Sequence, residues 1–358
     1  MKQGLSMRIL NHFAIIFTGC LFASGLAVGC THSLPEPSSS VQGNRDNPIT
    51  ADISCHADIK VVSPGKGYAL SRMFAFMKAS ADIRSVFEER MSEKVRSVLL
   101  ALSRGEKPDS SDEIALLIAE KAEDIYRARA AANGKEVSSL ADFLKDFIVS
   151  SPAFPDDCAG FVQLFMPGLR IVSIREENNK IVIHAVFSPE QYRLAKQIID
   201  RNNDKGAILD FAVNEAPLPA EMSEAICCFG WRIGKDSIGE PILFAFGQGV
   251  AVSDSPQSQS KAYSKAGLDS QNELRKALAE LIIAASVEKL LRERPLETIN
   301  SVSIAAQAAD LRKKCSTLTI RGSKKLKSSM FRLSSSEIVS VQATGMKPLD
   351  IMSSMKFE

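Results

Sequence analysis

The sequence predicts an α+β protein with two small lobes, each built from a short antiparallel sheet packed against long helices. Long stretches have apolar residues at helical spacing, whereas other stretches are β-branched runs that flank turn residues. The order strand, long helix, strand pair occurs twice along the 358 residues, which indicates an internal duplication of one α+β unit.

The first lobe is defined by clear turn and helix-start signals. Asn178 and Asn179 lie between two β-branched runs, and Asn tolerates the positive φ angles of a tight hairpin. Ser188 precedes a proline and predicts the start of a helix, and Ser110 and Glu113 have the spacing of a capping box. The elements expected in this lobe, residues 51–215, are a strand at 53–62, helices at 68–102, 110–132 and 140–149, a strand pair at 169–174 and 181–187, and a helix at 189–202.

The second lobe repeats the scheme loosely. Gly247 and Gly249 lie where a phosphate cradle would be, but Val252 stands where the third glycine of a dinucleotide-binding fingerprint belongs. We therefore interpret the two glycines as a strand-end turn. Ser255, which precedes a proline, predicts the start of a long helix. The elements expected in this lobe, residues 216–358, are strands at 225–233 and 241–252, a helix at 256–291, a shorter helix ending near Lys314, and strands at 317–320, 330–333 and 338–343.

The first thirty residues differ from the rest of the chain. Two cations, Lys2 and Arg8, precede a run of apolar or small residues at 13–28. This layout is typical of a secretory signal, and translation from either Met1 or Met7 would produce it. The run is shorter than the roughly 20 residues that a permanent membrane-spanning helix needs.

Ala27-Val28-Gly29-Cys30 resembles the lipobox of bacterial lipoproteins, in which small residues precede a cysteine. The resemblance implies that Cys30 receives a diacylglycerol thioether, that residues 1–29 are removed, and that the new amine is acylated. Ala27 departs from the family pattern, in which Leu is usual at that position. The segment 17–20, which ends in Cys20, is a second and poorer candidate.

Residues 30–50 are rich in Pro and Ser and have almost no large apolar side chain, which predicts a solvated tether. In lipoproteins of two-membraned bacteria a residue other than Asp after the cysteine implies sorting to the outer membrane, and Thr31 follows Cys30. Two alternatives stay open, namely an ordinary cleaved signal with a chance cysteine and an uncleaved single-helix anchor.

Charge argues against a nucleic-acid partner. The chain has 44 Lys and Arg against 42 Asp and Glu, and two of the cations lie in the predicted signal, so the remaining chain is neutral. The segment 311–333 is locally basic and has no acid. It is either a patch for anionic headgroups, lipopolysaccharide or an acidic partner, or a solvated helix end and hairpin loop. Its cations are Arg312, Lys313, Lys314, Arg321, Lys324, Lys325, Lys327 and Arg332.

The residue patterns of common catalytic sites are missing from the sequence. After the tether the histidines are only His56 and His184, and they form no metal-ligand or acyl-transfer spacing. We therefore assign no catalytic, cofactor-binding or metal residue and expect no cofactor. Five cysteines follow the anchor, and the preferred interpretation is buried thiols, although a disulfide between two of them stays open. They are Cys55, Cys158, Cys227, Cys228 and Cys315.

The segment Phe244–Ile283, a strand followed by an Ala-rich helix, is similar to periplasmic modules of some flagellar and outer-membrane lipoproteins. Together these features predict a lipid-anchored envelope protein, at the outer membrane rather than the inner, that binds or assembles with an envelope partner and is not an enzyme. One alternative is an envelope hydrolase whose acidic catalytic residues are scattered in the sequence. Convergent, partly buried carboxylates in a cleft would favour it.

Overall fold

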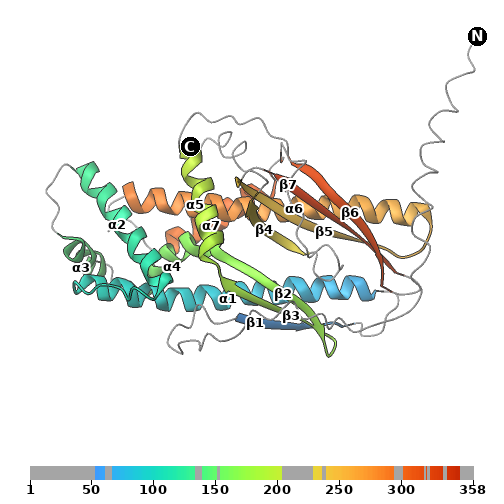
Figure 1. Cartoon of the computed structure of the whole chain (residues 1–358), viewed down its shortest axis with the longest axis horizontal. Coiled ribbons are helices and arrows are strands. Elements are labelled where there is room, and N and C mark those ends of the chain that lie inside the picture. Colours follow the sequence, from blue (N-terminus) through green and yellow to red (C-terminus); the bar gives the residue numbers. More distant parts are fainter. Residues whose placement is uncertain are drawn as a thin grey trace, which may run out of the picture. The chain divides into compact units, whose positions relative to one another are not determined.

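A computed structural model describes residues 53–60, 67–133, 139–150, 154–203, 229–235, 239–293, 301–317, 320, 323–333 and 337–346. The chain divides into two units, Met1–Gly43 and Asn44–Glu358, and all described residues belong to the second unit. The described elements are helices and two separate antiparallel sheets of three and four strands (Figure 1). This confirms the predicted α+β class with two sheet lobes.

The three-stranded sheet consists of β1 (Ile53–Asp58), β2 (Leu169–Glu177) and β3 (Lys180–Phe187), in the order β1-β3-β2. Both pairings are antiparallel. Asn178 and Asn179 connect β2 to β3 with φ angles of 49° and 60°, which confirms the predicted tight hairpin.

The four-stranded sheet consists of β4 (Gly230–Lys235), β5 (Pro241–Ala251), β6 (Lys324–Arg332) and β7 (Ile338–Met346), in the order β4-β5-β7-β6. The prediction placed the start of β6 six residues too late and expected a further strand at 317–320, where Thr317 in fact lies in a turn. The β6 strand lies at the sheet edge and is rich in exposed Lys, so it lacks the apolar alternation on which the prediction relied.

Helices α5 and α6 begin at signals that are local in the sequence. The Ser188 hydroxyl accepts a hydrogen bond from the Gln191 amide at 3.2 Å, and the Ser255 hydroxyl accepts one from the Ser258 amide at 3.2 Å, as predicted. The predicted capping box at Ser110 is wrong. The helices are α1 (Tyr68–Ser103), α2 (Glu113–Asn133), α3 (Leu140–Ser150), α4 (Phe154–Phe165), the 3-10 turn η2 (Met166–Gly168), α5 (Pro189–Asn203), α6 (Pro256–Glu293) and α7 (Ser301–Ser316).

Two corrections concern helix starts. Asp112 caps α2, because its carboxylate accepts a hydrogen bond from the Ala115 amide at 3.0 Å and it directly precedes the helix. The sequence analysis expected no helix between residue 149 and the strand at 169, and so missed α4, which has Pro155 in its first turn. Proline is tolerated in the first turn of a helix, and the second half of α4 buries Phe161 and Phe165 in the core.

The two sheets share one connectivity. In the first, β1 leads through helices to the β2-β3 hairpin, and β1 pairs with the second strand of that hairpin. In the second, β5 leads through α6 and α7 to β6-β7, and β5 again pairs with the second hairpin strand. The long helices α1 and α6 each pack on the two paired strands of their own sheet. The repeated order expected from the sequence is therefore present in the fold, with β4 as an additional edge strand.

Helix α1 also contacts the second sheet. Phe76 stacks on Phe229, next to β4, with ring centroids 4.3 Å apart, and Ala69 packs in a small cluster with Phe246 of β5. The buried carboxylate of Glu337, just before β7, accepts hydrogen bonds from the amides of Gly67 at 2.6 Å and Ala69 at 3.0 Å. The start of α1 is thus capped by a residue from the other end of the chain.

Gly247 and Gly249 lie inside β5, and the predicted strand-end turn is wrong. A Cβ on Gly247 would lie 2.0 Å from the backbone nitrogen of Ser270, and one on Gly249 would lie 1.9 Å from the carbonyl oxygen of Ala262. The glycines therefore allow α6 to approach the strand backbone closely, which a larger residue would prevent.

Candidate functional site

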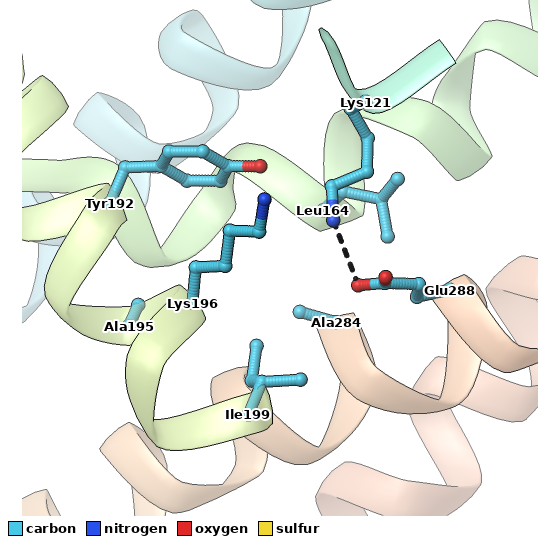
Figure 2. Close-up of a pocket in the computed structure, with 8 residues that line it drawn as sticks. All are labelled: Lys121, Leu164, Tyr192, Ala195, Lys196, Ile199, Ala284 and Glu288. Atoms are coloured by element: carbon cyan, nitrogen blue, oxygen red, sulfur yellow. Dashed lines mark ion pairs between the residues drawn. The ribbon is translucent and has the colours of Figure 1, made fainter. Parts of the chain in front are cut away.

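Three helices, α2, α5 and α6, meet around a small pocket, to which α4 adds Leu164. The cavity has a volume of about 10 Å³, and an adjoining hollow that shares Lys121, Tyr192 and Lys196 has about 140 Å³. The first holds about one water molecule, and both are smaller than the roughly 300–1,000 Å³ of typical small-molecule sites. The cavity is lined by Lys121, Leu164, Tyr192, Ala195, Lys196, Ile199, Ala284 and Glu288 (Figure 2).

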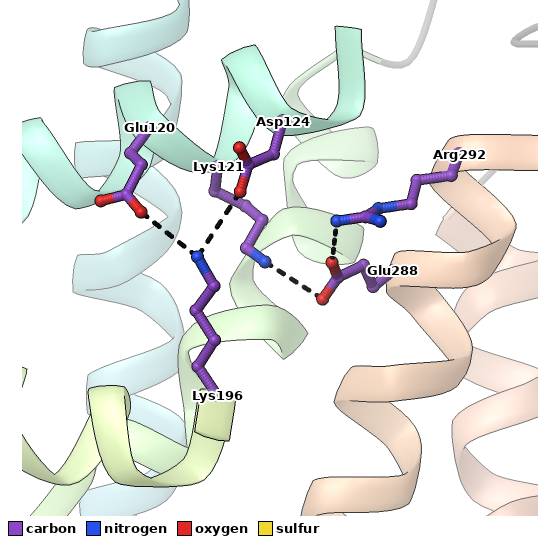
Figure 3. A network of polar contacts seen from close by, with 6 residues as sticks. All are labelled: Glu120, Lys121, Asp124, Lys196, Glu288 and Arg292. Atoms are coloured by element: carbon purple, nitrogen blue, oxygen red, sulfur yellow. Dashed lines mark hydrogen bonds and ion pairs between the residues drawn. The ribbon is translucent and has the colours of Figure 1, made fainter. Parts of the chain in front are cut away.

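A buried charge lies at the base of this pocket. The side chain of Lys121 is 3% exposed, and its Nζ lies 3.1 Å from Oε2 of Glu288. The other oxygen of Glu288 lies 2.5 Å from Nη2 of Arg292 (Figure 3). One carboxylate of α6 thus pairs with a lysine of α2 and with an arginine of its own helix.

A second ion cluster lies at the mouth of the pocket. Nζ of Lys196 on α5 lies 3.2 Å from Glu120 and 3.5 Å from Asp124, both on α2 (Figure 3). Burial opposes the charge on Lys196, but the hydrogen bond to Glu120 and the charges of Glu120 and Asp124 outweigh it and raise the pKa of Lys196. The ammonium therefore stays charged and connects α5 to α2.

Tyr192 completes the pocket wall. Burial raises the pKa of its hydroxyl, and the charges of Glu288 and Glu120 raise it further, so the hydroxyl stays neutral. Its ring stacks on Phe165 with centroids 5.1 Å apart. In Figure 2 the hydroxyl and the ammonium groups of Lys121 and Lys196 all point into the space between the helices.

Carboxylates do converge here, as the hydrolase alternative requires. Glu120, Asp124 and Glu288 each lie within 3.5 Å of a lysine nitrogen, as Figure 3 shows. Each of the three carboxylates thus takes part in an ion pair that connects two helices. The arrangement can connect three helices and can hold a water molecule.

The sequence analysis missed this cluster, although it contained a signal. Lys121 occurs at helical spacing from the buried residues Leu117, Ile118 and Ile125, so it interrupts the apolar stripe of α2. A charge in such a stripe indicates a buried ion pair, but the sequence does not identify its partner 167 positions later, Glu288.

Helix α1 carries a separate exposed apolar stripe. Leu70, Phe74 and Met77 are 43%, 58% and 50% exposed. Their spacing of four and then three residues places them on one face of the helix. Large apolar side chains exposed together are typical of surfaces that bind another molecule.

The structure divides the predicted basic patch between two elements. On α7, Arg312 contacts Gln163 of α4 at 3.3 Å and lies 3.6 Å from Glu280, and Lys314 pairs with Asp310 at 2.9 Å. The side chain of Lys313 is exposed. Two of the three α7 cations thus face acids from outside the 311–333 segment.

The other described patch residues lie on β6. Lys325 donates a hydrogen bond to the hydroxyl of Tyr263, and Arg332 pairs with Asp254 at 2.9 Å. Lys324 and Lys327 are exposed on the same strand. Arg321 lies outside the described residues, as does the predicted lipidation site, Cys30.

The remaining sequence candidates are the cysteines, a metal site and a membrane-spanning helix. Cys158 and Cys315 are buried and Cys55 is half-buried, whereas Cys227 and Cys228 lie outside the described residues. Among the described residues no three His, Cys, Asp or Glu side chains gather as metal ligands. None of the described helices is both long and apolar enough to cross a bilayer.

Comparison with known proteins gives little further information. No family model matches the chain, and no curated protein matches it. The chain is similar to the crystal structure of the hypothetical protein FTT1539c from Francisella tularensis, with 14% sequence identity and a TM-score of 0.45. The match covers 82% of this chain and 82% of that chain.

Proposed function

We propose that this chain is a lipid-anchored protein of the bacterial cell envelope that acts as a binding or assembly component. The observation that carries the proposal is the lipobox-like segment Ala27–Cys30, which follows a short apolar run and precedes a Pro- and Ser-rich tether. Thr31, in place of Asp, favours the outer membrane.

The division of the chain supports a separate anchor and body. The boundary between the two units follows Gly43, which lies within the predicted tether 30–50. A flexible tether of this length would hold the body on the order of 25 Å from the lipid surface.

The apolar stripe of α1 supports the binding role. A spacing of four and three residues matches the seam along which two helices pack, and Leu70, Phe74 and Met77 supply large side chains for it. We therefore take the partner at this stripe to be an amphipathic helix of another envelope protein.

Cell fractionation tests the anchor. After lysis without detergent, the chain should sediment with membranes, whereas a Cys30→Ala variant should appear in the soluble fraction or as unprocessed precursor. The matched control is Cys20→Ala, which removes the poorer lipobox candidate and should leave the chain in the membrane pellet. If Cys20→Ala releases the chain and Cys30→Ala does not, the assignment of Cys30 is wrong.

Site-specific photocrosslinking in cells tests the stripe. Crosslinkers placed at position 74 and at position 77 should capture the same partner, and Leu70→Glu should abolish both crosslinks. Leu116→Glu, at an exposed apolar residue of α2 that is 40% exposed, should preserve them. Different partners at the two positions, or equal loss in both variants, would contradict a specific helix-binding stripe.

A further inference from the structure

The α2–α5–α6 pocket, formed by the cavity and the adjoining hollow between these helices, contains hydrogen-bond donors that lack an acceptor. The ammonium of Lys121 has Glu288 as its counter-charge at 3.1 Å, but it is buried and forms no hydrogen bond to the described residues. Within the described part of the chain, the hydroxyl of Tyr192 also has no acceptor. Both groups point into the space between the helices (Figure 2). Buried donors of this kind are costly unless water or a ligand accepts from them.

Lys196 supplies a third donor to the same space (Figure 2). Its ammonium lies 3.2 Å from Glu120 and 3.5 Å from Asp124, and an ammonium has three N–H groups, so one N–H is left for another acceptor. Burial raises the pKa of the Tyr192 hydroxyl, which therefore keeps its proton and can donate it. All three available groups are thus donors, and the pocket fits a ligand that accepts hydrogen bonds.

The charges around the pocket limit the charge of that ligand. Arg193, which also lines the hollow, is paired with Glu113 at 2.5 Å, and Asp200 adds a further acid close to Glu288. The surroundings therefore have no excess of positive charge to compensate a dianion such as phosphate, whereas a carboxylate adds a single charge. The charged groups drawn in Figure 3 balance, with the cations Lys121, Lys196 and Arg292 against the carboxylates Glu120, Asp124 and Glu288.

The size and the walls of the pocket limit the rest of the ligand. The hollow has a volume of about 140 Å³, and a cavity of about 150 Å³ holds a molecule the size of benzene. Leu117 lines the hollow beside the ring of Tyr192, and Leu164 and Ile199 line the adjoining cavity. Aliphatic side chains next to the donors fit a short hydrocarbon chain attached to the accepting group.

We propose that the α2–α5–α6 pocket binds a short aliphatic carboxylate, whose oxygens accept hydrogen bonds from Tyr192, Lys121 and Lys196. Its hydrocarbon chain would contact Leu117. Glu120, with a side chain that is 59% exposed, marks the side from which the ligand enters. The site lies in the body of the protein and depends neither on the lipid anchor nor on a partner at the α1 stripe.

Titration with carbon-13 acetate and propionate, followed by the line width of the ligand signal at constant ionic strength, tests this proposal on the full chain. Tyr192→Phe removes the hydroxyl and keeps the ring that stacks on Phe165. Loss of a hydrogen bond to a charged ligand should weaken binding at least about tenfold. The matched control is Tyr126→Phe, on α2 outside the pocket lining, which should bind both ligands as the natural chain does.

A second variant should change the affinity in the opposite direction. Glu120→Gln removes a negative charge at the mouth of the pocket and leaves Lys196 with Asp124, so carboxylate binding should tighten by about two- to fivefold. Glu123→Gln is the control for this change of charge, because Glu123 lies on the same helix but pairs with the exposed Arg127 at 3.0 Å. It should leave the affinity unchanged.

A series of ligands tests the predicted charge and size. Propionate should bind more tightly than phosphate, and hexanoate more weakly than propionate, because its chain exceeds the hollow. The proposal is overturned if no ligand shows saturable binding, if Tyr192→Phe behaves like Tyr126→Phe, or if Glu120→Gln behaves like Glu123→Gln. Tighter binding of phosphate would show that the site is not selective for a carboxylate. None of these results bears on the lipid anchor, which has its own test.

Discussion

Lys121 and Glu288 form the most buried ion pair of the α2–α5–α6 pocket, at 3.1 Å. We expect Glu288→Gln to lower the free energy of unfolding by about 3 kcal/mol, because it leaves the ammonium of Lys121 buried without a counter-charge. Lys121→Met should lower the free energy of unfolding by less, because it removes the buried charge itself. Glu288 then still has its ion pair with Arg292 at 2.5 Å. Urea unfolding of both variants measures this, and a larger cost for Lys121→Met would contradict the arrangement.

Tyr68 gives the stability of the protein a dependence on alkaline pH. Burial, together with the hydrogen bond that its hydroxyl donates to Glu176, raises its pKa from 10.0 to about 12. The raised pKa means that the folded state keeps the phenol proton more tightly than the unfolded state. The contribution of Tyr68 to the free energy of unfolding is therefore complete below pH 10, and it is lost as the pH rises toward 12.

After solvent screening this contribution amounts to about 1 kcal/mol. Urea unfolding at several pH values should show a steeper loss of stability between pH 10 and 12 in the natural chain than in Tyr68→Phe. Parallel curves for the two chains would show that Tyr68 does not titrate in this way.

Among the elements, the contact between α6 and β5 depends most strongly on single residues. Gly247→Ala should destabilise the fold by at least about 3 kcal/mol, because the added Cβ would lie 2.0 Å from the Ser270 nitrogen and 2.2 Å from the Ala266 oxygen. Gly267→Ala is the matched control, since its Cβ meets only the flexible end of Gln342 at 3.3 Å. Thermal unfolding should show a large loss for the first and at most a small change for the second, and similar values would refute this packing.

The start of α1 depends on a residue from the other lobe. Glu337→Gln should lower stability by about 1–2 kcal/mol, since the carboxylate that accepts two amide hydrogen bonds at the helix N-terminus loses its charge. Glu106→Gln, in an exposed pair with Arg104, should change it little. Chemical denaturation measures the free energy of unfolding of both variants. Equal effects of the two substitutions would show that the Glu337 cap does not stabilise α1.

Elements with local signals were predictable from the sequence. The Asn178-Asn179 turn and the helix starts at Ser188 and Ser255 are determined by neighbouring residues, and the structure confirms all three. Edge strand β6 was misplaced because its residues do not alternate. The packing role of Gly247 depends on contact with Ser270 of α6, 23 positions further along the chain, so a local pattern could not show it.

The charged pocket was missed for a related reason. Lys121 and Glu288 come from helices far apart in the sequence, and only the fold brings them within 3.1 Å. The basic run of the sequence divides between α7 and β6 in the fold, and Arg312, Lys314 and Arg332 each lie near an acid from outside the run, which the sequence did not show.

At the scale of the whole molecule, the two described sheets share one connectivity, and α1 contacts both of them. This helix packs on β1 and β3, stacks Phe76 on Phe229, and takes its N-terminal cap from Glu337. The body of the protein thus presents the apolar stripe of α1 as an exposed surface. In our account the tether holds this stripe near a membrane.

Intact mass spectrometry of the chain extracted from membranes tests this account most directly. The account predicts a polypeptide that begins at Cys30 and carries the added mass of a diacylglycerol and an N-acyl group, and Cys30→Ala should lack both the cleavage and the added mass. A chain that retains residues 1–29, or one that is cleaved but carries no lipid, would contradict it.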